Sequence, residues 1–345
     1  MTGPAEIVRR VRGRASGRLH SLPILALVVH GACNCRCVMC DIWRANAQAR
    51  EISDAVLAAH VDAIRRLRVR RVMLTGGEPL LHRNLWALCD RLRAEGIALT
   101  LVTTGTLAAR DAARIRAAVD TVVVSLDGPP GVHDAIRGVP QGFRRLADGV
   151  RALAAGHPRP RLIARSVVQR ANHAVLASTV RAAAQAGFDE ISFLAADLVS
   201  SAFNRPDPWP AARVAEVAVG AGDLPALAAA IDRVEAECAD ALDARFIAGG
   251  TSGLRRIHAY YTAAAGLGPW PAVRCNAPWV SAVLEPDGAL RPCFFHPAYA
   301  PVDGALDATL NGAGAVDFRQ RLDVATDATC RRCVCSLYLP PGADA

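Results

Sequence analysis

Residues 22–40 read LPILALVVHGACNCRCVMC, an apolar run that leads directly into a cysteine-rich loop. Cys33, Cys37 and Cys40 have the spacing C-x3-C-x2-C, so one short loop offers three thiolates to a single metal centre. A cubane iron–sulfur cluster held by three thiolates keeps one iron open for a further ligand. The spacing alone leaves two alternatives open: a zinc site with a fourth ligand from elsewhere, and thiols that are merely buried.

The rest of the chain has the pattern of an α/β protein. From Leu22 onward, short apolar runs alternate with longer helical patterns, which is typical of βα units and a parallel sheet. The expected strands are 22–29, 70–75, 97–103, 121–126, 161–169 and 190–196. The expected helices lie near 52–68, 84–95, 108–118, 141–155 and 174–187. Six such units make an open or partly closed barrel, and ligands bind at the carboxyl ends of its strands.

A glycine turn follows the second expected strand, where residues 74–79 read LTGGEP. Two glycines let the backbone approach a ligand closely, and Glu78 places a carboxylate beside them. A Gly-Gly turn is weak evidence by itself. Its position one βα unit after the cysteine loop makes it a candidate part of the same site.

The two motifs together resemble those of the radical S-adenosylmethionine (SAM) enzymes. The resemblance implies a partial (β/α)6 barrel of the radical SAM type. It implies a [4Fe-4S] cluster on Cys33, Cys37 and Cys40, whose open iron chelates the amino and carboxylate groups of SAM. It also implies that SAM is bound by Gly76, Gly77 and Glu78.

Three more SAM contacts follow from the resemblance. Ser125 begins SLDG, with His133-Asp134 and Arg137-Gly138 downstream, which is similar to a segment of SPASM and Twitch relatives in which the serine lies near SAM. Thr104 stands where many relatives carry an asparagine that contacts SAM. Arg165 is similar in position to an arginine that reaches the SAM carboxylate, and a plain surface arginine is the open alternative. Cys35 lies outside the motif, and we interpret it as a packing residue.

A second set of cysteines lies near the C-terminus. Cys275 and Cys293 flank an expected hairpin that turns at Asp287-Gly288, and Cys330, Cys333 and Cys335 follow. A zinc knuckle is one interpretation. Beside a radical SAM core, the set resembles a Twitch domain, the short form of the SPASM module that holds one auxiliary [4Fe-4S] cluster. The implied ligands are Cys275, Cys293, Cys330 and Cys333, with Cys335 as a possible replacement.

Composition excludes several other classes of protein. All 40 basic residues are arginine, so a Schiff-base lysine, a pyridoxal phosphate anchor and a P-loop lysine are excluded. The net charge of +8 is spread over many segments with few aromatic residues, which favours a solvated surface over a nucleic-acid interface. A zinc-stabilised nucleic-acid-binding protein is the remote alternative, and it leaves the Gly-Gly-Glu-Pro turn unexplained.

The chain of 345 residues is expected to have four parts. They are a basic, flexible or helical arm at 1–20, the radical SAM core at 21–200, a helical linker region at 201–270, and the cysteine-rich Twitch/SPASM-like domain at 271–345. The purely apolar runs are shorter than the ~20 residues of a membrane span, and clustered cysteines suit a reducing compartment. We therefore expect a cytoplasmic protein without a membrane segment.

The implied reaction is radical chemistry on a substrate. The resemblance implies reductive cleavage of SAM to a 5′-deoxyadenosyl radical, hydrogen abstraction from the substrate, and electron transfer to the auxiliary cluster. It also implies a flavodoxin- or ferredoxin-type electron donor. Because only 32 residues precede Cys33, we expect a small-molecule substrate, with a peptide that is crosslinked as the alternative. Glu190, Asp197 and Asp287 are carboxylates that could take a proton, and the sequence does not choose among them.

Overall fold

The computed structural model describes residues 3–205, 207–301 and 304–344. Its contacts form two compact units, and each is described by itself. Unit 1 comprises Met1–Cys33, Arg44–Leu101 and Val273–Ala345; unit 2 comprises Asn34–Trp43 and Val102–Ala272. The four-part division expected above stays a prediction, and its outermost positions, residues 1–2 and 345, lie outside the described residues.

Parallel strands form the centre of unit 1. β1 (Ile24–His30) pairs with β2 (Arg71–Gly76), which pairs in turn with the first part of β3 (Ala98–Thr103). Alternating apolar side chains of β1 are completely buried, which is why this stretch forms a central strand. The helices α2 (Asp54–Arg66) and α3 (Leu85–Ala94) follow β1 and β2, as the helical periodicity predicts.

The expected hairpin extends this sheet. β7 (Ser281–Leu284) and β8 (Ala289–Arg291) are antiparallel, and Gly288 has the positive φ of +85° that the turn requires. β7 also pairs in parallel with β1, which the sequence did not predict. A short strand, β9 (Ala300–Pro301), completes the edge.

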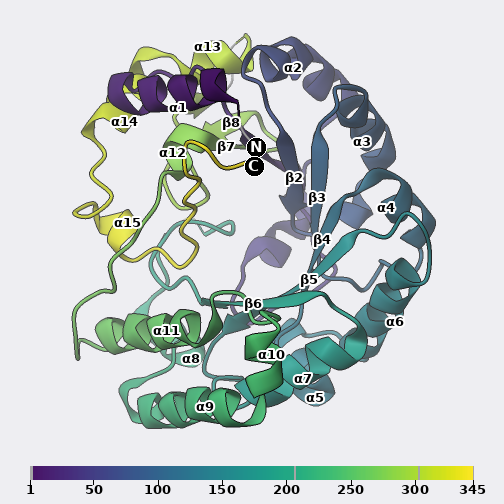
Figure 1. The fold of residues 1–345 in the computed structure, drawn as a ribbon, viewed down its shortest axis with the longest axis vertical. Coiled ribbons are helices and arrows are strands. Elements are labelled where there is room, and N and C mark those ends of the chain that lie inside the picture. The colour runs from purple at the N-terminus through teal and green to yellow at the C-terminus, as the bar shows by residue number, and fades with distance from the viewer. Residues whose placement is uncertain (1–2, 206, 302–303, 345) are drawn as a thin grey trace. The chain divides into compact units, whose positions relative to one another are not determined.

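The N-terminal arm is a helix docked on the C-terminal segments of unit 1. α1 (Pro4–Ser16) lies beside α12 (Ala277–Val280) and α14 (Ala313–Arg321), as Figure 1 shows. Arg319, which is buried, donates from Nε to the carbonyl oxygen of Gly17 at 2.6 Å. The remaining short helices are α13 (Leu306–Leu310) and α15 (Ala328–Arg331).

Unit 2 continues the βα pattern. β4 (Thr121–Ser125), β5 (Arg161–Val168) and β6 (Glu190–Ala195) are parallel and paired in that order. The helices between and beside them are α4 (Ala112–Ala118), α5 (Pro130–Arg137), α6 (Gly142–Ala154) and α7 (Leu176–Ala186). All six strands and five helices predicted from the periodicity are therefore confirmed within a few residues, and the fold class is α/β.

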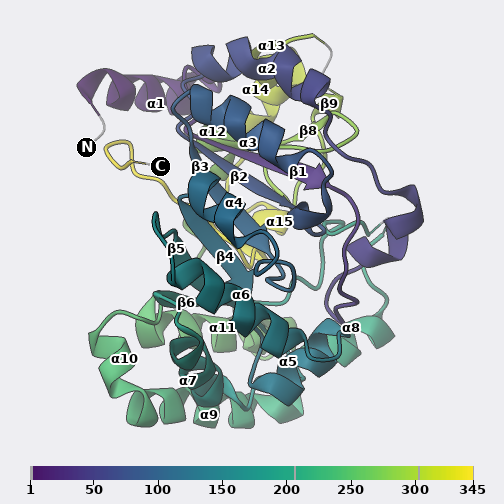
Figure 2. The ribbon, with the colours of Figure 1, turned by 90° about the vertical axis from the view of Figure 1, so that its right-hand side faces the viewer.

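The region after β6 is helical but interrupted. Within the expected helical linker region, residues 211–244 form α8 (Ala211–Val217), the 3-10 helix η3 (Ala221–Asp223), α9 (Leu224–Glu237) and α10 (Ala239–Asp243). Two glycines and a proline near residues 220–225 account for the break. α11 (Gly250–Ala264) follows and packs against α9 and β6 (Figure 2).

One described stretch, Ala211–Glu237, has the length and hydropathy of a membrane span. The break between α8 and α9 interrupts it. Leu227, Ile231 and Val234 of α9 are buried, and α9 packs against α7 and α11. About 33% of the apolar window in this stretch is buried, so α9 has the features of an amphipathic helix that packs one face within unit 2.

Candidate functional site

The cysteine loop rests on the last turn of α5. Arg36 N donates to Arg137 O at 2.9 Å, and Val38 N donates to Ile136 O at 3.0 Å. Gly138 ends the helix with φ of +62°, and a Cβ there would lie 3.0 Å from Arg36 O. The segment that resembles a SAM-contacting motif in relatives thus also supports the loop.

The Cys37 thiol lies in a charged, buried setting. Arg137 donates from Nη1 to Cys37 Sγ at 3.6 Å, and its Nη2 lies 2.6 Å from Asp127 Oδ2. A hydrogen bond from Cys35 and the positive charge of Arg137 outweigh burial, and together they lower the pKa of Cys37 to about 6. This thiol is therefore disposed to be a thiolate near neutral pH, which is the form that binds iron.

The carboxylate of Asp127 is fixed by neighbouring elements of unit 2. Its Oδ1 accepts a hydrogen bond from Val167 N in β5 at 2.8 Å. Asp127 N donates to His133 Nδ1 at 3.2 Å. Burial lowers the pKa of His133 to about 3, so the ring is neutral and its Nδ1 can accept.

The glycine turn packs on the residues that lead into the cysteine loop. Gly77 N donates to His30 O at 2.9 Å, and Glu78 N donates to Ala32 O at 2.8 Å. A Cβ on Gly77 would lie 2.1 Å from Ala32 O, and one on Gly76 would lie 2.3 Å from His30 O. Only glycine permits this approach of two backbones. Part of what the motif does is therefore to hold the start of the loop.

Two polar groups in unit 1 organise this turn and the first cysteine. Glu78 is completely buried, and its Oε1 accepts a hydrogen bond from Leu80 N at 3.0 Å at the start of η2 (Pro79–Leu81). Asn46 lies in η1 (Ile42–Gln48). Its Oδ1 accepts a hydrogen bond from Cys33 N at 3.0 Å, and its Nδ2 donates to Cys33 O at 2.9 Å. These two hydrogen bonds fix the backbone of Cys33, and no motif in the sequence points to Asn46.

Of the other predicted SAM contacts in unit 2, Ser125 ends β4, Thr104 follows β3, and Arg165 lies within β5. Ser125 and Arg165 are register partners on β4 and β5, and both are half-buried. Arg165 Nε donates to Ser192 Oγ at 3.3 Å. Thr104 is buried, and its hydroxyl donates to Asn34 Oδ1, next to Cys33 in sequence, at 3.4 Å. The roles of these three residues toward SAM stay predictions.

The C-terminal cysteines gather in unit 1. All eleven cysteines of the chain lie within the described ranges, and none forms a disulfide. Burial raises the pKa of Cys333 to about 12, and the neighbouring thiols of Cys335, Cys275 and Cys293 act in the same direction. Burial likewise raises the pKa of Cys330, with added contributions from Cys293 and Cys275. A cation would remove this penalty, so the donor set fits a metal centre.

His296 is a polar neighbour of this set whose place the sequence did not decide. Its Nε2 lies 3.3 Å from Cys330 Sγ and 3.6 Å from Asp327 Oδ1. Asp327 also accepts a hydrogen bond from Cys330 N at 2.8 Å and so caps α15. In the sequence, the position of His296 three residues after Cys293 indicates that it could approach this set, and a packed or surface histidine is the favoured alternative.

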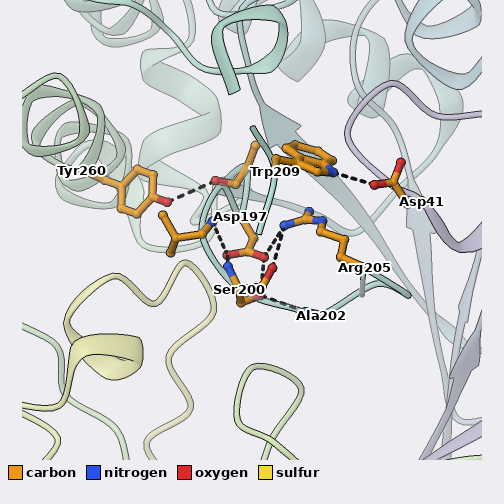
Figure 3. A network of polar contacts seen from close by, with 9 residues as sticks. Asp41, Asp197, Ser200, Ala202, Arg205, Trp209 and Tyr260 are labelled. Carbon is orange, nitrogen blue, oxygen red and sulfur yellow. Dashed lines mark hydrogen bonds and ion pairs between the residues drawn. The ribbon is translucent and has the colours of Figure 1, made fainter. Parts of the chain in front are cut away.

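The region after β6 also reaches the cysteine loop in unit 2. Trp209 donates from Nε1 to Asp41 Oδ2 at 2.5 Å, and Asp41 directly follows Cys40 (Figure 3). Arg213 donates to the carbonyl oxygen of Val38. No sequence pattern predicts these contacts, because they join positions more than 160 residues apart.

The fit to an iron–sulfur centre follows from the donors. Cys33, Cys37 and Cys40 supply three thiols from one loop without disulfide bonds, and Cys37 is stabilised as a thiolate. Soft thiolate donors select iron–sulfur clusters, zinc or copper, as opposed to magnesium or calcium. Cys89 and Cys238, by contrast, are buried within helical segments, and burial raises the pKa of Cys89 to about 12, as expected for structural thiols.

Comparison with known proteins identifies a family for the core. The family model of the radical SAM superfamily matches residues 27–192. The chain is 33% identical to pre-heme d1 synthase of Dinoroseobacter shibae over 133 residues, which are 38% of this chain and 33% of that protein. It is 43% identical to GTP 3′,8-cyclase of Xanthomonas axonopodis over 113 residues, 30% of this chain and 34% of that protein. It is 34% identical to mycofactocin maturase MftC of Mycolicibacterium smegmatis over 110 residues, 31% of this chain and 28% of that protein. The matched segments thus span about a third of each relative.

Two solved structures extend the likeness beyond this core. Streptococcus suis SuiB bound to precursor peptide SuiA has a TM-score of 0.60 at 14% identity, over 98% of this chain and 78% of that one. Native anSMEcpe with bound AdoMet has a TM-score of 0.62 at 16% identity, over 89% of this chain and 84% of that one. At these identities the likeness shows the fold: a partial (β/α)6 barrel with a cysteine-rich C-terminal region.

Proposed function

We propose that the chain is a radical SAM enzyme of the SPASM/Twitch subgroup, which cleaves SAM reductively and oxidises a substrate by hydrogen abstraction. The observation that carries the proposal is the Cys37 thiol, whose lowered pKa and contact with Arg137 suit a cluster ligand. When bound, the cluster and SAM supply the 5′-deoxyadenosyl radical that abstracts hydrogen.

The residues of the chain hold and shield these groups in the proposal. Cys33, Cys37 and Cys40 hold the first [4Fe-4S] cluster. The proposed SAM contacts are Gly76, Gly77, Glu78, Thr104, Ser125 and Arg165. Glu78 and Thr104 are each buried, so water is excluded from both of these side chains.

The C-terminal cysteines hold an auxiliary [4Fe-4S] cluster in the proposal. Its ligands are Cys275, Cys293, Cys330 and Cys333. Cys335 is exposed, whereas Cys330 is buried and the other three are half-buried, which favours Cys333 over Cys335 as the fourth ligand. Four thiolates would leave no iron open, and this cluster would then accept the electron that the substrate radical loses.

For the substrate, we propose a small molecule or natural-product intermediate. A peptide is the second candidate, because the fold matches that of SuiB, which was solved with its precursor peptide. A reduced flavodoxin or ferredoxin is the proposed electron donor. The proposed location is the cytoplasm, where clustered thiols stay reduced.

Anaerobic purification tests the cofactors. Two cubane clusters require about eight irons and eight sulfides per chain and give a brown protein. A colourless protein with stoichiometric zinc would reject the enzyme and support the zinc alternative.

Two variants test the division of roles. Cys37→Ala is expected to abolish reductive SAM cleavage, since it removes a ligand of the SAM-binding cluster. Cys293→Ala is expected to keep some cleavage while it loses substrate oxidation. Cleavage that is equal to wild type in both variants would contradict the assignment of the two cysteine sets.

A further inference from the structure

Arg205 lies in the segment that follows β6, and its guanidinium is fixed on one edge and one face. The side chain is 1% exposed. Its Nη1 donates to Asp197 Oδ2 at 2.8 Å and to Ser200 O at 3.3 Å. The ring of Trp209 lies 3.8 Å from the guanidinium carbon (Figure 3). These contacts set the orientation of the group before any ligand binds.

The opposite edge of the same guanidinium has no acceptor. Nε and Nη2 of Arg205 are buried and lack a hydrogen-bond partner among the residues that the structure describes. These two N–H groups point in parallel and form the edge with which a guanidinium binds a carboxylate through two hydrogen bonds. Leaving such donors buried and unpaired is costly, so a ligand that accepts from both would be favoured.

Other arginines in the chain show which group satisfies this edge. Arg66 donates from Nε and Nη2 to the two oxygens of Asp307 at 2.8 and 2.9 Å. Arg91 does the same with Asp54 at 3.0 and 2.8 Å. Arg205 presents the same pair of donors without the carboxylate.

Asp197 does not accept from Nε and Nη2 of Arg205, because both of its carboxylate oxygens already accept other hydrogen bonds. Its Oδ1 lies 3.5 Å from Val199 N and 3.4 Å from Ser200 N. Its Oδ2 accepts from the hydroxyl of Ser200 at 2.5 Å as well as from Arg205. Asp197 thus balances the charge of Arg205 without using the free edge.

The backbone that leads into Arg205 is strained. Phe203 and Asn204, which lead into Arg205, have φ of +58° and +63°. Two successive non-glycine residues in the left-handed region cost of order 1 kcal/mol each and occur at ligand clamps. The Phe203 ring lies 5.6 Å from the guanidinium carbon and is 36% exposed. The strained backbone therefore leads directly into Arg205.

The site is connected to the cysteine loop within unit 2. Trp209, which stacks on Arg205, hydrogen-bonds Asp41 beside Cys40. The segment also begins at the carboxyl end of β6, the edge where sheets of this kind bind ligands. Trp209 therefore connects a ligand bound to Arg205 with the cysteine loop.

We propose that Arg205 binds the carboxylate of the substrate through its Nε and Nη2, so that the enzyme acts on a carboxylate-bearing molecule. This proposal rests on the proposed function and narrows its substrate class. Trp209 and Asp197 act as positioning residues for the guanidinium.

The test is an NMR titration of the cluster-loaded protein with butyrate or with butyramide. It follows the indole N–H resonance of Trp209, one of five tryptophans in the chain. The Trp209→Phe variant assigns the resonance. Butyrate is expected to shift it saturably and leave the other four resonances in place. Butyramide, which has nearly the same shape without the charge, is expected to leave it unmoved. No response to butyrate, or an equal response to both compounds, would overturn the proposal.

Variants separate the contribution of the planar Nε/Nη2 edge of Arg205 from that of its positive charge. Arg205→Lys keeps a cation for Asp197 but lacks the planar edge, and it is expected to weaken butyrate binding about tenfold or more. Arg91→Lys is the matched control and should leave the titration unchanged. If Arg205→Lys weakens SAM binding instead, the edge belongs to the SAM carboxylate and the proposal is wrong.

The wild-type comparison of butyrate with butyramide decides the question even if Arg205→Lys does not fold. Binding of butyrate needs no SAM cleavage. Failure of the carboxylate site is therefore distinguishable from failure of the radical chemistry, which is measured by SAM cleavage in wild-type protein.

Discussion

Nη2 of Arg137 lies 2.6 Å from Oδ2 of Asp127, and both side chains are almost completely enclosed. The same guanidinium donates from Nη1 to Cys37 Sγ, so the ion pair holds the donor that contacts a proposed cluster ligand. The ion pair thus joins the segment after β4 to the end of α5, and it also positions the guanidinium that contacts Cys37.

Removal of one partner of this pair should cost much stability. Arg137→Met leaves a buried carboxylate without its counter-charge, and we expect a loss of ~3–5 kcal/mol in the free energy of unfolding. Adding Asp127→Asn removes that charge, keeps an acceptor for Val167 N, and should restore part of the loss. Urea unfolding of the two variants and wild type measures this.

A half-exposed pair is the control for the Arg137 variant. Arg159 and Asp189, with side chains 34% and 33% exposed, form a surface ion pair. Arg159→Met should cost at most ~1 kcal/mol. Equal losses from Arg137→Met and Arg159→Met would show that burial of the first pair has no energetic consequence.

Gly77→Ala should disrupt the entry of the cysteine loop. The added Cβ would lie 2.1 Å from the carbonyl oxygen of Ala32, so one backbone must move. We expect a loss of at least ~2 kcal/mol in stability and a lower iron content. Gly131→Ala is the matched control, because nothing lies within 4 Å of its Cβ. Iron content at wild-type level in Gly77→Ala would contradict this reading of the turn.

Tyr261 should be important for the strand ends of unit 2. Its hydroxyl donates to Val168 O at 2.6 Å and accepts from Ala196 N at 2.9 Å, and it is completely buried. Tyr261→Phe removes the hydroxyl that pairs with both backbone groups and should cost ~1–3 kcal/mol in the free energy of unfolding. Tyr338→Phe, at a 39% exposed position, should change stability by less than ~0.5 kcal/mol.

The neutral His133 should make stability depend on pH. Burial lowers its pKa from 6.5 to about 3. Below pH 6.5 the unfolded chain binds a proton that the folded chain does not, so stability falls as the pH is lowered. The slope approaches about 1.4 kcal/mol per pH unit for this group. Urea unfolding at pH 7.5, 6.5 and 5.5 should show a flatter dependence for His133→Gln than for wild type, and identical dependences would refute the assignment.

His296 should influence the proposed auxiliary cluster through Cys330, one of its proposed ligands. A hydrogen bond to a ligating thiolate raises the potential of an iron–sulfur cluster. His296→Phe removes the group that lies 3.3 Å from Cys330 Sγ, and the second cluster should titrate at a more negative potential. Redox titration followed by electron paramagnetic resonance measures this. Direct nitrogen coupling to the cluster in wild type would mean that His296 is a ligand and would replace this interpretation.

Much of this protein is determined by local sequence. Apolar periodicity predicted the six strands and the helices between them, because alternation and helical spacing report which face of each element is buried. The spacing of Cys33, Cys37 and Cys40 is equally local, since three donors within one loop need no tertiary contact to share a centre. The break near residues 218–223 was missed because isolated glycines are weak signals against an alanine-rich background.

Tertiary structure alone decided what surrounds those donors. Arg137 is 100 positions from Cys37, and Trp209 is 168 from Asp41, so no periodicity relates either pair. The open edge of Arg205 exists only because Asp197, Ser200 and Trp209 take the remaining surfaces of the guanidinium. Sequence fixes which groups are available, whereas packing decides which are buried and paired, and the unpaired ones are left for a ligand.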